Sequence, residues 1–205
     1  MIKKILKIFG ALILVAGIAY VWHVHVNYRF ETISDGKVYK SALINPERLG
    51  DFLQKYKIKT VIDLLDPGVQ DKLNPAKQKE IDEEQKAVDE FNKKHGTHVK
   101  HVNIPSRQVP TKKTLTKFFK VLDDTSNYPV LIHCYHGTGR AQIYSALYRM
   151  EYEGWSNADA RAKTRVVVQA LGYRSSFADG KSKGDFLMHY KPRKEGKNST
   201  LNTIK

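Results

Sequence analysis

Short apolar runs and amphipathic stretches alternate through most of the chain. Runs rich in β-branched and aliphatic residues predict buried strands at Thr60–Leu65, Val99–Ile104 and Val130–Ile132, with an edge strand at Lys37–Ser41. Amphipathic periodicity and cap residues predict helices that begin at or just after Asn45, Pro75, Thr111, Gln142, Ser156 and Phe186. Because strands alternate with helices, the sequence predicts an α/β domain with a mostly parallel central sheet flanked by helices.

The amino-terminal segment differs from the rest because Ile8–Trp22 carries no charge and lies directly behind Lys3, Lys4 and Lys7. A membrane span needs about 20 apolar residues, whereas a signal peptide has a shorter apolar region and a cleavage site. Aromatic residues at the end of the run favour an uncleaved, single-pass anchor. Positive charge before the segment predicts that the domain is periplasmic or otherwise extracytoplasmic. Secretion after cleavage is the alternative.

Composition divides the chain into four parts. We expect an anchor or signal segment at residues 1–26, a linker at 27–36, a folded domain at 37–190 and a basic disordered tail at 191–205. The length of 205 residues suits one domain with its own core. A single cysteine, Cys134, excludes an internal disulfide and leaves its thiol for chemistry.

The chain is strongly basic. Its formal net charge is +14, and the three lysines before the apolar run account for three of these, which leaves +11 on the remainder. Such a surface favours anionic partners, namely phosphorylated substrates or acidic lipid headgroups. We expect no nucleic-acid partner, because no nucleic-acid motif accompanies the charge and the basic residues are scattered.

Cys134 lies where a predicted strand ends and a predicted helix begins. Gly137 and Gly139 allow the intervening loop to curl and to aim successive backbone N–H groups at one point. The helix N-terminus adds positive potential, and the guanidinium of Arg140 adds a fork of donors suited to phosphate oxygens. The same field favours the thiolate form of Cys134. The sequence therefore predicts an anion-binding loop around a nucleophile.

The loop matches the pattern HCxxGxxR through His133, Cys134, Gly137 and Arg140. In this motif the chain resembles the cysteine-based protein tyrosine and dual-specificity phosphatases, in particular their small bacterial dual-specificity branch. The segments VYKSALINPERL and KYKIKTVIDLL extend the resemblance, which spans about Lys37 to Tyr190. It implies a phosphocysteine intermediate on Cys134 and no metal or other cofactor. The substrate-binding residues that it implies are His133, Tyr135, His136, Gly137, Thr138 and Gly139.

Two features depart from that family. Its members usually carry Ser or Thr after the arginine, where a hydroxyl stabilises the thiolate as it leaves phosphorus, and this chain has Ala141. Hydrolysis of the intermediate is then slower, or Thr138 or Gln142 substitutes. Family members also protonate the leaving oxygen with an Asp on a loop upstream of the nucleophile. The corresponding segment here, NIPSRQVP, contains no acid.

The carboxyl ends of parallel strands form the ligand-binding edge of an open sheet. This rule brings Asp66 and Arg107 to the cysteine loop, because each follows a neighbouring predicted strand. Asp66 is either the replacement general acid or an ordinary turn residue before Pro67. If Asp66 is only a turn residue, the site has no dedicated general acid, which suits substrates with good leaving groups. Arg107 either holds a second anionic group or is simply exposed.

Three functions remain open on these residues. The first is a membrane-tethered phosphomonoester phosphatase of the tyrosine or dual-specificity type, acting on phosphorylated proteins or on a phospholipid with the same chemistry. The second is a pseudophosphatase that binds phosphorylated ligands without turnover. The third, a metal site at His133, Cys134 and His136, is disfavoured because neighbours on a tight loop rarely converge on one tetrahedral ion.

Overall fold

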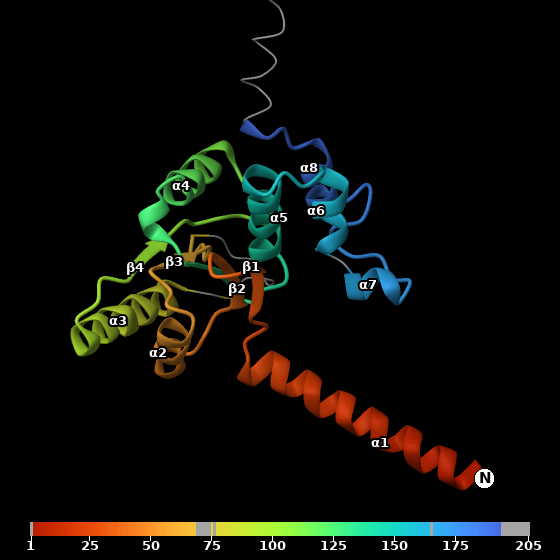
Figure 1. Ribbon diagram of the computed structural model, residues 1–205. Coiled ribbons are helices and arrows are strands. Elements are labelled where there is room, and N and C mark those ends of the chain that lie inside the picture. Colours follow the sequence, from red (N-terminus) through yellow and green to blue (C-terminus); the bar gives the residue numbers. More distant parts are fainter. Residues whose placement is uncertain (1, 69–74, 76, 165, 194–205) are drawn as a thin grey trace, which may run out of the picture.

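A sheet lies at the centre of the domain, with helices around it (Figure 1). Its five strands run in the order β1-β2-β5-β3-β4. The computed structural model describes residues 2–68, 75, 77–164 and 166–193. β1 (Glu31–Ser34) runs antiparallel to β2 (Val38–Ala42). β2, β5 (Val130–Cys134), β3 (Thr60–Asp63) and β4 (Lys100–Asn103) are parallel to one another. The predicted α/β class with a mostly parallel sheet is therefore confirmed.

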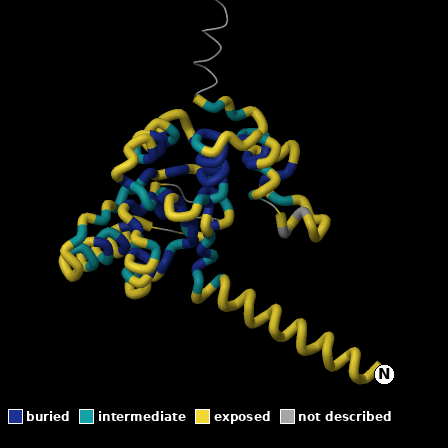
Figure 2. Tube along the Cα trace, viewed as in Figure 1, coloured by how far each residue is buried: buried dark blue, intermediate teal, exposed yellow. Residues whose placement is uncertain are grey.

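Helices cover both faces of the sheet. α2 (Pro46–Lys55) and α3 (Gln78–His95) pack on one face. The other face is covered by α4 (Lys112–Leu122), α5 (Arg140–Tyr152), α6 (Asn157–Lys163) and α8 (Ser182–His189). A short helix, α7 (Val166–Ala170), follows α6. α5 is buried along almost its whole length (Figure 2), so the loop that precedes it is held by the core.

The expectation of an edge strand at Lys37–Ser41 is wrong, because β2 lies between β1 and β5. β1 falls within residues 27–36, which we expected to be a linker, and it pairs Glu31 with Lys40 across the sheet. A strand of four residues is too short for its alternation to stand out in the sequence. The folded part of the chain therefore begins before residue 31.

Several helix and tail boundaries also differ from the sequence prediction, among them the start of α8 at Ser182 rather than Phe186. α3 begins at Gln78 rather than Pro75, because the Glu80 carboxylate accepts from the Lys77 N–H at 2.7 Å and caps the helix there. The helix predicted to begin at or just after Ser156 is short: α6 ends at Lys163, and α7 begins at Val166. Residues 191–193, expected in the tail, belong to the fold. Arg193 bonds Glu151 at 3.0 Å, whereas residues 194–205 lie outside the described part.

The amino terminus is one exposed helix, α1 (Ile2–Val21), continued by a π-helical turn at Trp22–Val26. The helical stretch Ile2–Val26 is long and apolar enough to cross a membrane, with a mean hydropathy of 2.2, and none of it is buried by the domain (Figure 2). A signal sequence near the N-terminus meets the same criterion. Apolar surface of this extent in water calls for a membrane or another partner to cover it.

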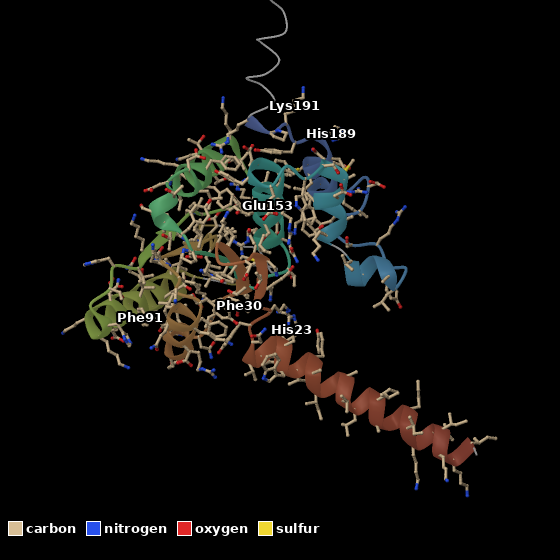
Figure 3. The ribbon with its side chains drawn as sticks, in the orientation of Figure 1. His23, Phe30, Phe91, Glu153, His189 and Lys191 are labelled. Carbon is tan, nitrogen blue, oxygen red and sulfur yellow. The ribbon has the colours of Figure 1, made fainter. Side chains whose placement is uncertain are left out.

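The chain passes from this helix directly into the core. The Arg29 N–H donates to the His23 carbonyl at 2.8 Å, and Tyr28 and Phe30 are both buried. The Phe30 ring stacks on the Tyr56 ring with centroids 4.2 Å apart, just beyond the helix that carries His23 (Figure 3). No extended spacer separates the helix from the domain.

Candidate active site

Cys134 is the last residue of β5 and lies at the carboxyl edge of the sheet. Its strand is paired on both sides, with Ala42 of β2 opposite Cys134 and Asp63 of β3 opposite His133. The thiol-bearing residue is only 2% exposed. Two neighbouring strands therefore fix the backbone that carries the nucleophile.

Gly137 shapes the loop after Cys134. Its φ is +69°, a left-handed conformation that favours glycine. A Cβ at this position would lie 2.6 Å from the Ala42 nitrogen and 2.8 Å from the Ser41 carbonyl oxygen. The loop thus rests directly on β2, at a distance that no larger residue permits. The Lys40 ammonium donates to the Gly137 carbonyl at 3.3 Å and holds it there.

Arg140 opens α5 and ties three loops together. Its guanidinium donates to the Leu64 carbonyl, after β3, and to the Ser106 carbonyl at 3.2 Å, after β4. The side chain is buried yet lines the cleft over Cys134. Hydrogen bonds to two main-chain carbonyls fix the plane of the guanidinium, so its fork is held in place before an anion arrives.

A cleft of about 200 Å³ opens over the cysteine. It is lined by Gln108, Cys134, His136, Thr138, Gly139, Arg140, Ser176 and Lys183. No carboxylate is found among these lining residues, within the described part of the chain. A larger groove of about 680 Å³ lies at the opposite ends of the strands, between α2, α3 and the start of β4. We place the chemistry in the smaller cleft, because only that cleft contains a nucleophile and a fixed guanidinium.

Lys183, from the first turn of α8, is a cleft residue that the sequence did not reveal. It is 9% exposed, and its ammonium lies over the Phe177 ring at 5.6 Å. Gly184 allows this approach, because a Cβ there would lie 2.3 Å from the Ala178 carbonyl oxygen. A Cβ on Gly139, at the N-terminus of α5, would lie 3.1 Å from the Lys183 ammonium. The ammonium therefore lies close to the N-terminal end of that helix.

The electrostatic environment around the loop is positive. Burial lowers the pKa of Lys40, although Glu31, at 3.2 Å, and Cys134 oppose that shift. The pKa of His136 is lowered by burial and by the charges of Arg29 and Arg140. The Arg29 guanidinium also donates to the His136 carbonyl at 3.1 Å. This combination favours a dianionic ligand in the cleft.

A cluster of charged side chains lies behind the loop, on the α3 side of the sheet. The Glu84 carboxylate lies 2.9 Å from His133 Nε2 and 2.8 Å from His101 Nε2. Asp63 is 3.8 Å from His133. Most polar residues of α3 are exposed, whereas Glu84 is only 1% exposed. The single acidic position on the apolar stripe of that helix, three residues after Ile81, was the available signal.

The ligand atoms of Asp63, Glu84 and His101 lie within 4.8 Å of one another, a spacing that a divalent cation could bridge. The two Glu84–histidine distances, however, are those of hydrogen-bonded or ion-paired groups. Ligands on one tetrahedral ion, with bonds of about 2 Å, stand about 3.3 Å apart. We therefore interpret the cluster as ion pairs.

The sequence-predicted residues fall into two groups. Cys134, His136, Thr138, Gly139 and Arg140 all line the cleft, and Gly137 shapes its floor. The remaining members lie elsewhere: His133 faces Glu84, and the Tyr135 ring packs beside Leu65 and Ile81.

Asp66 and Arg107 are not among the lining residues. One Asp66 oxygen accepts from the Gly68 N–H at 3.1 Å, which is the ordinary role of Asp in a turn. Arg107 is exposed. Their catalytic and binding roles remain predictions.

The candidate site thus combines a buried cysteine at the end of a parallel strand, a glycine-shaped loop and an arginine fixed by main-chain carbonyls. Residues 31–178 match the family described as DSP-PTPase phosphatase fused to NAD+ kinase, and the chain belongs to this family. No curated protein matches the chain significantly.

Solved structures share the fold. The catalytic core of the PP-IP phosphatase Siw14 from S. cerevisiae is 19% identical, with a TM-score of 0.56 over 85% of this chain and 92% of that one. TpbA from P. aeruginosa is 19% identical, with a TM-score of 0.54 over 80% and 86%. PTPMT1 is 18% identical, with a TM-score of 0.54 over 84% and 99%. These three structures therefore have the same fold as this chain.

Proposed function

We propose that the protein is a membrane-tethered phosphatase that works through a phosphocysteine intermediate on Cys134. The Cys134 sulfur attacks phosphorus, so that a sulfur–phosphorus bond forms as the ester phosphorus–oxygen bond breaks. The loop N–H groups and Arg140 hold the three remaining phosphate oxygens. Water then attacks the phosphocysteine and releases phosphate and the thiolate. The observation that carries this proposal is the cleft in which Cys134 and the fixed guanidinium of Arg140 meet.

The leaving oxygen needs a proton when its alcohol is a poor leaving group. The described cleft residues contain no carboxylate, which favours substrates whose leaving group departs as a stable anion. Asp66 remains the general acid of the alternative mechanism. If Asp66 acts in this way, Asp66→Asn slows alkyl phosphates about 10² to 10⁴-fold and aryl phosphates far less. Equal small losses for both kinds of ester would exclude Asp66.

A tyrosine or dual-specificity activity on phosphorylated proteins is the first substrate assignment, because it follows from the loop motif. A lipid phosphate is the second, and one structural feature favours it. Arg29, three residues beyond the apolar helix, donates to the His136 carbonyl of the cleft at 3.1 Å. If the helix spans a bilayer, the catalytic cleft lies close to the headgroups, and each basic residue there adds about 1 kcal/mol of attraction.

The test of the enzyme uses the full chain in detergent micelles, because β1 lies upstream of residue 37. Hydrolysis of an aryl phosphate is measured with EDTA present for wild type and for Cys134→Ser. We expect turnover by the wild type, none by the variant, and a trapped phosphocysteine after acid quench. If both proteins are inactive, the pseudophosphatase hypothesis is favoured over the enzyme. If both are equally active, Cys134 is not the nucleophile.

The substrate is tested by competition between phosphotyrosyl peptides and phosphatidylglycerophosphate or phosphoinositides in mixed micelles, at two salt concentrations. A kcat/KM preference for the lipids that weakens with salt supports the lipid assignment. A salt-insensitive preference for peptides of about tenfold or more contradicts it.

A further inference from the structure

Glu84 lies deep inside the protein, although it belongs to a helix that is otherwise mostly solvated. Its side chain is 2% exposed, and that of the neighbouring His133 is 1% exposed. An unpaired carboxylate at such depth costs several kcal/mol, so its position depends on a cationic partner. The acidic neighbour Glu83, by contrast, is exposed and pairs with Lys79 at 3.5 Å.

His133 is the partner that connects Glu84 to the nucleophile. Its Nε2 is 2.9 Å from Glu84, at ion-pair distance, while neither ring nitrogen makes a hydrogen bond of good geometry. Asp63 is a weaker partner at 3.8 Å, because its two oxygens accept from the Leu65 N–H at 2.7 Å and the Asn103 amide at 2.8 Å. Glu84 is thus the main counter-ion of the residue that immediately precedes Cys134.

The pKa shifts of the two residues agree with this geometry. Burial alone would lower the pKa of His133, but the Glu84 charge, with smaller contributions from Asp63 and Cys134, raises it to about 9. Burial would likewise raise the pKa of Glu84, but the two histidines lower it to about 2. At neutral pH the pair is therefore an imidazolium and a carboxylate. Without the carboxylate, burial would favour a neutral His133.

Among the described residues, the charged groups around His133 and Cys134 come from several elements. His133 is faced by Glu84 from α3, Asp63 from β3 and, beyond Glu84, His101 from β4. Lys40 from β2 faces Cys134, which opposes the lowering of the Lys40 pKa by burial. Within the cleft Cys134 is also faced by Arg140, His136 and Lys183.

We propose that Glu84 is a positioning residue for the nucleophile: its ion pair with His133 holds a positive charge at the base of the loop and so raises the reactivity of Cys134. The proposal rests on the proposed function, since it assigns the device that activates the same cysteine. It places part of the catalytic electrostatics on α3, on the face of the sheet opposite α5.

The test measures the thiol directly and does not require turnover. Because Cys134 is the single cysteine of the chain, its alkylation by neutral iodoacetamide can be followed by mass across pH 5 to 10. For Glu84→Gln we expect an alkylation rate about tenfold lower than wild type at pH 6, and an equal rate at pH 10. Glu83→Gln, a matched exposed change on the same helix, should follow the wild-type curve.

A double-mutant cycle separates this role from a merely structural one. If Glu84 acts through His133, Glu84→Gln adds nothing to the alkylation profile of His133→Gln. Identical profiles for wild type and Glu84→Gln would overturn the proposal. If Glu84→Gln fails to fold, NMR titration of His133 in the wild type decides, and a neutral ring at pH 7 overturns the proposal. An altered thiol profile in a protein that hydrolyses no phosphate would instead count against the proposed function alone.

Discussion

Gly137 offers the sharpest test of how the loop is held. Replacing it by alanine places a Cβ 2.6 Å from the Ala42 nitrogen, where ordinary contacts begin at about 3.4 Å. The loop must then move away from β2 by about 0.8 Å, because the neighbouring atoms are backbone atoms of a paired strand. The φ of +69° adds a backbone cost of about 1 to 2 kcal/mol for an L-residue.

A displacement of this size should separate activity from stability. A misplacement of about 1 Å at a reacting centre costs about 100-fold in rate, so we expect kcat/KM of Gly137→Ala to fall by about that factor. Gly96→Ala is the matched control. Gly96 has a φ of +64°, and a Cβ there meets nothing within 4 Å. It should lose about the same backbone free energy and keep full activity.

The assay combines kcat/KM for an aryl phosphate with thermal unfolding of both variants and of wild type. We expect both variants to show a lower Tm and only Gly137→Ala to lose activity and affinity for vanadate. If Gly137→Ala retained kcat/KM within a factor of about two of Gly96→Ala, the loop would not depend on its close approach to β2, and the reasoning would be refuted.

Three further outcomes follow from the same contacts. Lys183→Ala should raise KM about tenfold, because one charged hydrogen bond to the substrate is lost. Lys181→Ala, a change at an exposed position, should leave KM unchanged, and equal effects of the two substitutions would contradict the placement of Lys183 in the cleft. Ala141→Ser should raise steady-state turnover if release from phosphocysteine limits the rate, and an unchanged burst and rate would exclude that limit. Because the pKa of His133 is raised from 6.5 to about 9 and that of Glu84 is lowered from 4.5 to about 2, their pair stabilises the fold fully between pH 4.5 and pH 6.5 and progressively less up to pH 9. The difference in unfolding free energy between wild type and Glu84→Gln, from urea titrations, should therefore shrink from pH 6 to pH 9, and a constant difference would contradict this linkage.

The central part of the fold was readable in the sequence because it is encoded locally. The apolar run Val130–Ile132 and the turn-forming glycines after it predict a strand, a loop and a helix. The spacing of Cys134 and Arg140 needs no distant contact to be recognised, and both residues line the cleft as expected. The apolar segment Ile8–Trp22 likewise stands out by composition alone, and it lies within the exposed helical stretch Ile2–Val26.

Other features were decided by contacts between distant segments. Lys183 enters the cleft because Gly184 lets α8 approach residues 177 and 178 closely, and no local pattern announces that approach. β1 forms a strand because it pairs with β2. Its four residues carry too little hydrophobic periodicity for this pairing to be predicted from the sequence.

The same limit explains Glu84 and Asp66. From the sequence, Glu84 on its charged helix would be assigned to the solvent-exposed surface. In the tertiary structure it lies 2.9 Å from His133, which follows it by 49 residues in the chain. Asp66, in contrast, has the expected place after β3, yet its side chain bonds its own turn. Local sequence determines where a residue lies along an element, whereas the direction and partner of a charged side chain are determined by desolvation and by the opposite charges that the fold brings to it.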